Sequence, residues 1–185
     1  VLDVLSQIDP NNLSDEDQLN YRLLKSDYEI SLEGREYPGY YMRLNQRGGV
    51  QDYYLYGNRL NFTDLQSYKN WFERVKDYTQ NVKNSLEINK EGLELGYTQP
   101  KLVTRGVSAQ IGAMLEKDLE DHPYFKIFKN VGDVASSEDA LALQNEVKEY
   151  IQNVLNPTYQ ELYDFLVNEY LPESRDTIGI SDVPN

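Results

Sequence analysis

The sequence predicts an all-α fold: a helical bundle of about four main helices, with a kinked last helix and one long loop rich in tyrosine and glycine. Two observations support this prediction. Apolar residues recur at spacings of three and four in four separate stretches, which places them on one face of a helix. Three of these stretches open with residues typical of helix caps. We expect residues 1–185 to form a single helical domain, the N-terminal portion of a larger protein.

The first helix is predicted to begin after Ser14, whose hydroxyl can cap it, and to end at Gly34. The acidic run that follows Ser14 suits the positive end of a helix dipole. Four apolar residues then share one face of the helix: Tyr21, Leu24, Tyr28 and Leu32.

The second helix has the clearest pattern of the four. Thr63 and Gln66 match the Thr-x-x-Gln capping box, so we expect the helix to begin there. A seam of about four heptads follows, which is typical of helices that pack antiparallel in a bundle. The seam consists of Leu65, Tyr68, Phe72, Val75, Val82, Leu86 and Leu93, with Thr79 and Asn89 in its polar gaps. The helix should fray near Gly92 and stop by Gly96.

The third helix is predicted to begin near Thr98, because Pro100 is tolerated in a first helical turn. It should end before Pro123. Its apolar stripe consists of Val103, Val107, Ile111, Met114 and Leu115.

The fourth helix is predicted to begin at Ser136 or Ser137, with two acidic residues in its first turn. Pro157 lacks a backbone N–H and should kink this helix. Because the apolar spacing resumes at once, we expect the helix to continue to Leu171–Pro172, followed by a loop from Glu173. The stripe consists of Leu143, Val147, Ile151 and Val154 before the proline, and Tyr159, Leu162, Phe165, Leu166 and Tyr170 after it.

The segment from Glu36 to Asn61 is predicted to be a long loop with turns at Tyr37–Tyr41 and Asn45–Gly49. Tyr53, Tyr54 and Tyr56 alternate enough for a short strand, so a small hairpin is the most β-structure we expect. Loops of this length are uncommon and are usually functional. The tyrosines can stack on a sugar or a peptide, or they can pin the loop to the bundle.

The composition excludes several classes of partner and site. The chain carries 18 Lys and Arg against 31 Asp and Glu, a net charge of −13, which repels nucleic acid and anionic membrane surfaces. It has no cysteine, which excludes disulfides, thiolate zinc sites and cysteine nucleophiles. No apolar run approaches the roughly 20 residues of a membrane span. The start at Val1 without Met suggests a processed or trimmed chain, and the compartment stays open.

We find no complete catalytic site or metal site in the sequence. Zinc hydrolases need ligands such as two histidines one helical turn apart, and the single histidine, His122, is expected to be structural or solvated. Arg47-Gly48-Gly49 lacks the Gly-Lys-Ser/Thr element of a phosphate loop. A cluster of carboxylates is expected to form a hydrated face: Glu116, Asp118, Glu120 and Asp121. No catalytic residue, metal ligand or cofactor is therefore predicted within this chain.

Several motifs, in this order and spacing, resemble the bacterial "domain of unknown function 885" family along nearly the whole chain. They are Leu13-Ser14-x-x-Asp17-x-Leu19-Asn20-Tyr21-x-Leu23-Leu24, Tyr37-Pro38, Leu44-Asn45-Gln46-x-Gly48-Gly49, Val107-x-Ala109-Gln110-Ile111, Pro157-x-Tyr159-x-x-Leu162-x-x-Phe165-Leu166, and Glu169-Tyr170-Leu171-Pro172-x-x-Arg175-x-x-Ile178-Gly179.

The resemblance implies a full-length helical zinc peptidase with a deep cleft, whose His-Glu metal motif lies downstream of the stretches matched here. It implies a downstream catalytic domain as partner, a peptide substrate, zinc as the cofactor of the full-length protein, and an exported or lipid-anchored location. The sequence ends soon after Gly179, where the family would continue, so no catalytic residue is transferred to this chain.

The leading hypothesis is a noncatalytic N-terminal domain that forms one wall of a peptidase cleft. Arginine can clamp a peptide carboxylate with two hydrogen bonds, so the candidate cleft residues are Gln46, Arg47, Arg105, Gln110 and Arg175. These residues can instead cap helices or bridge an interface. The alternative hypothesis is a free-standing helical binding or scaffold module that uses the tyrosine-rich loop.

Overall fold

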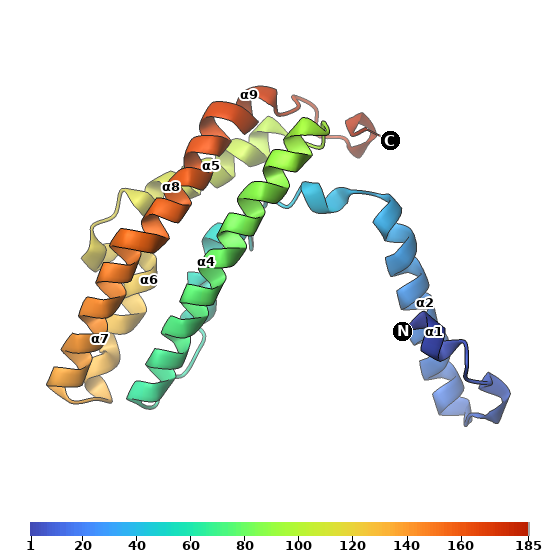
Figure 1. The fold of residues 1–185 in the computed structure, drawn as a ribbon, viewed down its shortest axis with the longest axis horizontal. Coiled ribbons are helices and arrows are strands. Elements are labelled where there is room, and N and C mark those ends of the chain that lie inside the picture. The colour runs from blue at the N-terminus through green and yellow to red at the C-terminus, as the bar shows by residue number, and fades with distance from the viewer. Residues whose placement is uncertain (185) are drawn as a thin grey trace. The chain divides into compact units, whose positions relative to one another are not determined.

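The computed structural model of the chain describes residues 1–184. The predicted all-α fold is confirmed, since this range contains helices and turns, no β-strand, and one isolated bridge between Pro100 and Arg175 (Figure 1). The longer helices are α2 (Asp15–Glu33), α4 (Leu65–Glu94), α5 (Lys101–Leu115), α7 (Ser137–Tyr150) and α8 (Asn156–Phe165). The short ones are α1 (Leu2–Leu5), α3 (Tyr54–Gly57), α6 (Pro123–Lys126) and α9 (Leu171–Glu173).

The described residues form two compact units, Val1–Gly39 and Tyr40–Pro184. The second unit contains the buried core and the hollows that flank residues 45–52. The single domain over residues 1–185 stays a prediction.

In the first unit, α1 packs against α2, where the Tyr21 hydroxyl donates a hydrogen bond of 3.2 Å to the carbonyl oxygen of Leu5. The predicted cap of α2 is confirmed, because the Ser14 hydroxyl accepts a hydrogen bond from the Asp17 N–H. No residue of α2 is buried, so the predicted apolar face, including Leu24 at 44% exposure, is largely uncovered within this unit.

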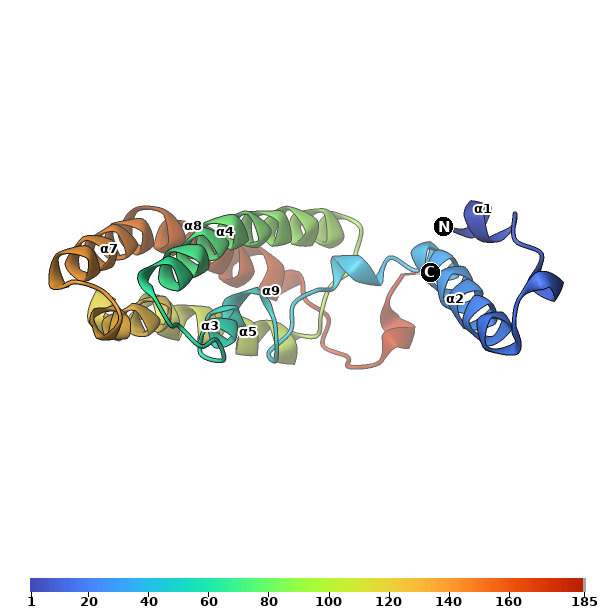
Figure 2. The same ribbon diagram turned by 90° about the horizontal axis from the view of Figure 1, so that it is seen from below.

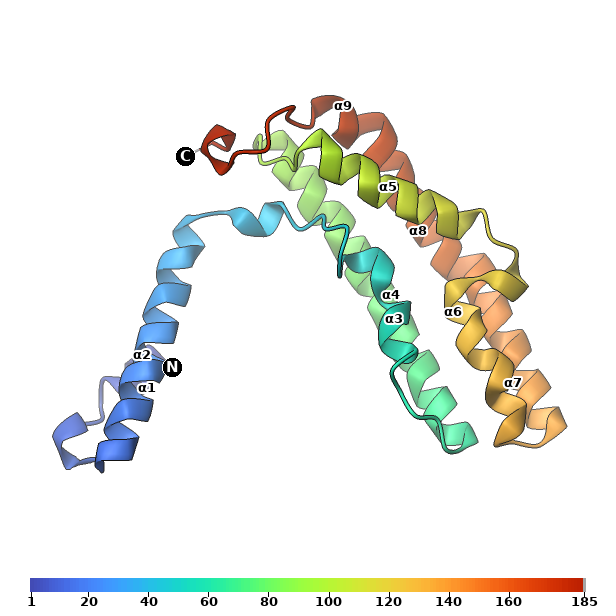
Figure 3. The ribbon, with the colours of Figure 1, turned by 180° about the vertical axis from the view of Figure 1, so that it is seen from behind.

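The second unit is built in two layers. Figure 2 shows α4, α7 and α8 in one layer and α3, α5 and α6 in the other, and Figure 3 shows the second layer from its own side. The helix α8 joins the layers, since it packs against both α4 and α5. The core between the layers is dominated by fully buried side chains, among them Trp71, Phe72, Val82, Val107, Ile111, Tyr124, Leu155, Tyr159, Leu162 and Leu166. The amphipathic stripes predicted for α4, α5 and α8 supply most of this core.

The beginning of α4 differs by one residue from the predicted capping box. Asp64, not Thr63, caps the helix: its carboxylate accepts a hydrogen bond of 2.7 Å from the Ser67 N–H. The Ser67 side chain accepts in return from the Asp64 N–H, which completes the box. Aspartate is as good a cap as threonine or better, so the helix takes the cap one residue later.

Replacing Asp64 with alanine should therefore lower the free energy of unfolding by about 1 kcal/mol, the usual value of an N-cap. The matched control is Thr63→Ala, whose effect should stay within about 0.5 kcal/mol because Thr63 lies outside the box. Urea denaturation of both variants measures the two effects. A larger loss in Thr63→Ala would show that the sequence-predicted cap is the one used.

The third helix, α5, begins later than predicted and ends before Pro123, as predicted. It begins at Lys101, after Pro100, rather than near Thr98, and it ends at Leu115. Thr98 is buried, and its carbonyl oxygen accepts a hydrogen bond from the Arg175 side chain, which holds this residue outside the helix. Residues 116–122 form turns that lead to α6.

The fourth helix runs without a loop from α7 through Pro157 to α9, so the predicted continuity is confirmed. The cap at Ser136 is confirmed as well, by a hydrogen bond from the Asp139 N–H to its hydroxyl. Two π-helical segments, Ile151–Leu155 and Leu166–Tyr170, interrupt the α-helical pattern. Each stands just before a proline, where the widened turn accommodates the lost N–H.

The predicted extended structure at Tyr53, Tyr54 and Tyr56 is wrong. A 3-10 turn at Val50–Asp52 leads into α3 instead. A helical turn brings residues three apart together, and the rings of Tyr53 and Tyr56 lie 5.5 Å apart. On a strand Tyr53 and Tyr56 would point to opposite faces, and their rings could not meet.

Candidate functional site

The candidate site is built around the turn at residues 45–52. Two side chains of the turn itself stabilise it by accepting hydrogen bonds from its backbone. The Asn45 side chain accepts a hydrogen bond of 2.9 Å from the Arg47 N–H. The Asp52 carboxylate accepts one of 2.9 Å from the Gly48 N–H. Gly48 has a φ of 83°, in the left-handed region that glycine adopts without strain. The local sequence therefore specifies an ordered turn.

Three glutamine side chains, Gln46, Gln51 and Gln110, fasten this turn to α5, and we call them the amide clamp. Gln110 donates a hydrogen bond of 3.0 Å to the carbonyl oxygen of Gln46. Gln51, which is buried, donates bonds of 2.8 Å to the Gln110 side chain and to the Asn45 carbonyl oxygen. Gln46 donates to the carbonyl oxygen of Leu102 on α5 at 3.3 Å.

Gly106 makes the close approach of the clamp to α5 feasible. A Cβ atom at this position would lie 1.5 Å from the Gln46 amide nitrogen, so only glycine leaves room for that side chain. The Gln46 side chain thus lies directly on the backbone of the helix.

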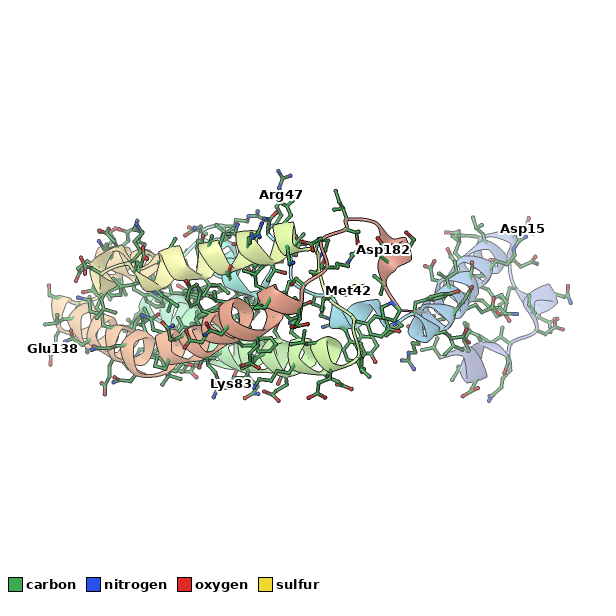
Figure 4. The ribbon with its side chains drawn as sticks, turned by 90° about the horizontal axis from the view of Figure 1, so that it is seen from above. Asp15, Met42, Arg47, Lys83, Glu138 and Asp182 are labelled. Carbon is green, nitrogen blue, oxygen red and sulfur yellow. The ribbon has the colours of Figure 1, made fainter. Side chains whose placement is uncertain are left out.

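The structure brings together some of the predicted site residues. Gln46 and Gln110 meet in the clamp. Arg47 is exposed, and Figure 4 shows its side chain extending away from the surface of the unit. Arg105 is exposed on α5. Arg175 lies elsewhere and donates hydrogen bonds to the carbonyl oxygens of Thr98 and Gly179.

Three hollows flank the turn in the second unit. The largest measures about 530 Å³ and is lined by Met42, Arg43, Leu44, Asn45, Gln46, Gly48, Gln99 and Val103. The second measures about 330 Å³ and is lined by Gly48, Gly49, Asp52, Tyr53, Leu55, Tyr56, Arg59 and Tyr78. The third measures about 280 Å³ and is lined by Gln51, Asp52, Tyr54, Gln110, Ala113, Met114, Lys117 and Pro123.

The loop tyrosines divide between the two roles considered from the sequence. Tyr41 is buried, and its hydroxyl donates a hydrogen bond of 2.6 Å to Glu91 on α4. The Tyr53 ring stacks on Tyr78 with ring centroids 3.6 Å apart. Tyr56 remains 61% exposed beside the second hollow. Some tyrosines thus pin the loop, and others are open to a ligand.

Two buried tyrosines support the turn from behind. The Tyr159 hydroxyl on α8 donates a hydrogen bond of 2.7 Å to the carbonyl oxygen of Val50. It also lies 2.8 Å from the Tyr124 hydroxyl of α6. Burial raises the pKa of both phenols, so both remain protonated at neutral pH. The turn is therefore held by α5 on one side and by α8 on the other.

His122 is buried rather than solvated, and neither ring nitrogen has a hydrogen-bond partner among the described residues. Burial lowers its pKa to about 4, against a smaller opposing effect of the Asn156 side chain.

In residues 1–184 no group of three or more His, Asp or Glu side chains could hold a metal ion. The four carboxylates of the predicted hydrated face are all exposed.

Sequence reasoning missed three residues that define this region: Gln51, Arg59 and Tyr78. Gln51 lies between the predicted turn at Asn45–Gly49 and the predicted strand at Tyr53–Tyr56, and its partner Gln110 is 59 residues away. Tyr78 lies on α4 and is partly buried, but it stands outside the predicted seam, so the apolar spacing gave no sign of its contact with Tyr53. None of the helices between residues 1 and 184 has the length and apolar character needed to cross a membrane, as the sequence led us to expect.

A family model described as "Bacterial protein of unknown function (DUF885)" matches residues 1–185. The match confirms the family resemblance drawn from the motifs. No curated protein and no solved structure matches the chain.

Proposed function

The chain belongs to this family of bacterial proteins, and we propose that it is the noncatalytic helical portion of a zinc-dependent, peptidase-like hydrolase, in which it forms one wall of the substrate cleft. In this proposal the zinc ligands and catalytic groups come from a downstream region of the same polypeptide. The substrate class is peptides, and an exported or lipid-anchored location stays a prediction.

One observation carries the proposal: an ordered turn that the amide clamp fixes on α5, with hollows beside it. Ligand sites need groups held in place before the ligand arrives, because ordering a loop on binding lowers the affinity. The clamp supplies that order here. Arg47, which projects from this turn, is suited to bind a carboxylate or a carbonyl oxygen of a peptide.

The test is Arg47→Ala in the protein that includes the downstream catalytic region. We expect kcat/KM for peptide hydrolysis to fall about tenfold, since a hydrogen bond to a charged group contributes about 1.5 kcal/mol or more. The Tm should hardly change, because Arg47 is exposed and its side chain has no hydrogen bond or ion pair within residues 1–184.

The matched control is Lys83→Ala, which removes an exposed positive charge on α4. Figure 4 shows Arg47 and Lys83 extending to opposite sides of the unit. Lys83→Ala should leave kcat/KM unchanged. Equal effects of the two variants, or a loss in Arg47→Ala that follows a loss of folded protein, would contradict the cleft assignment.

The alternative is a free-standing binding module, and the exposed Tyr56 beside the second hollow favours it. One observation separates the two functions. A native reading frame that continues past Asn185 into a His-Glu metal motif supports the hydrolase, whereas a natural stop codon there supports the module.

A further inference from the structure

The second hollow has features of a binding site that the amide clamp does not explain. Its volume of about 330 Å³ is at the small end of the range for ligand sites, about 300–1,000 Å³. It therefore suits a single terminal residue of a peptide better than an extended chain.

Of the aromatic residues that line this hollow, Tyr53 is held in place by stacking against two rings of α4. Trp71 and Tyr78 are seven residues apart on α4, about 10 Å along the helix axis. The Tyr53 ring is stacked on both, with ring centroids 5.4 Å from Trp71 and 3.6 Å from Tyr78, so it lies between them. A ring stacked in this way keeps a fixed position beside the hollow.

The polar groups at the hollow are mostly hydrogen-bond donors. The hydroxyls of Tyr53, Tyr56 and Tyr78 form no hydrogen bond with any residue between 1 and 184. Burial, with smaller contributions from Tyr53, Tyr56 and Asp52, raises the pKa of Tyr78 to about 12, so this phenol keeps its proton. Phenol hydroxyls that stay protonated can donate to an anionic oxygen.

Arg59 is the only cation that lines this hollow, and within the described range it forms no ion pair. Asp52 also lines this hollow, and one of its carboxylate oxygens accepts the Gly48 N–H. Because like charges repel, a bound carboxylate has to lie on the Arg59 side of the hollow, away from Asp52. A guanidinium with two parallel donors matches the geometry of a carboxylate. Leu55 and the tyrosine rings offer apolar surface next to it.

We propose that this hollow binds the C-terminal carboxylate of a peptide through Arg59 and the tyrosine hydroxyls, with the apolar side chain of the last residue against Leu55 and Tyr56. The inference rests on the proposed function, which supplies peptide as the ligand class. It adds a site and a preference that the candidate residues from the sequence did not include.

Binding is tested on the 185-residue chain itself, with N-acetyl-alanyl-phenylalanine as the free acid and as its C-terminal amide. Trp71 is the only tryptophan, and its ring lies 5.4 Å from that of Tyr53, so its fluorescence reports on the hollow. We expect saturable binding of the acid and at least about tenfold weaker binding of the amide, the effect of losing one charge-assisted contact. Calorimetry of the same pair checks the fluorescence.

Arg59→Ala should weaken binding of the acid about tenfold and remove its preference over the amide, while Arg59→Lys should restore part of it. Lys83→Ala should leave the affinity unchanged. Equal affinities of acid and amide, or no saturation at millimolar concentrations, would overturn the assignment. This experiment measures binding, whereas the Arg47 test measures turnover. A failure here would overturn the carboxylate site and would not decide the result of the Arg47 test.

Discussion

Replacing Tyr159 with phenylalanine should lower the free energy of unfolding by about 2–6 kcal/mol, because two groups lose their partner and each such loss costs about 1–3 kcal/mol. The ring of Tyr159 is completely buried. Its hydroxyl serves both the carbonyl oxygen of Val50 and the hydroxyl of Tyr124. Phenylalanine fills the same space and leaves both of those groups without this partner. Urea denaturation at neutral pH measures the loss.

Tyr163→Phe is the matched control for this effect. Tyr163 lies four residues further along α8, it is half-buried, and its hydroxyl forms no hydrogen bond within residues 1–184. Its substitution should change the free energy of unfolding by less than about 0.5 kcal/mol. Similar effects of the two substitutions would show that the Tyr159 hydroxyl contributes little.

Tyr159→Phe should also loosen the candidate site, because Val50 adjoins the clamped turn. Amide hydrogen exchange in residues 45–52 should become faster in this variant, whereas exchange in α4 away from the turn should not. Unchanged exchange in the turn would mean that the amide clamp alone holds it.

Acidification from pH 7 to pH 5 should destabilise the folded chain by about 2 kcal/mol through His122 alone. Burial lowers the pKa of His122 to about 4 in the folded chain, against an ordinary value of about 6.5 when it is unfolded. Between these values the unfolded state binds a proton that the folded state does not. Stability from this residue is therefore complete above pH 6.5 and falls steadily down to about pH 4.

His122→Gln removes this titration, so the wild-type protein should lose about 2 kcal/mol more than the variant between pH 7 and pH 5. The comparison is clean because His122 is the only histidine. Should the variant fold poorly, the imidazole proton resonances of the wild-type chain give the pKa directly. A measured pKa near 6.5 would contradict the prediction.

Periodic elements of the fold could be predicted from the sequence because their signal is local. The seam of α4 is the clearest case: Tyr68, Phe72, Val75, Val82 and Leu86 are all buried as their spacing required. The caps at Ser14 and Ser136 were predictable for the same reason, since each lies within three residues of its partner. Thr63 and Asp64 are adjacent and both are residue types that cap helices. The local pattern did not show which of the two would cap α4.

The candidate site was predicted only in part, because it depends on contacts between distant residues. Gln46 and Gln110 were chosen as ligand-binding groups, yet their amides bind backbone and other amides of this chain. Gln51 completes the clamp from a position with no periodicity. His122 lies before a proline at a predicted helix end, a place where exposure is the usual expectation, and it is nonetheless fully buried.

The two π-helical segments change the spacing of buried residues along the last helix. The buried residues from Leu143 to Ser174 follow mostly in steps of four, and eight such steps cover thirty-one residues. That averages about 3.9 residues per turn, so an α-helix of 3.6 would carry the stripe more than half a turn around its axis. Each π segment absorbs about one extra residue, which returns the stripe to the core. Deleting a single residue from either segment would rotate everything after it by about 100°. Buried residues that repeat every four positions are thus typical of this widened helix. The face on which the later residues lie depends on the number of residues in the two π-helical segments.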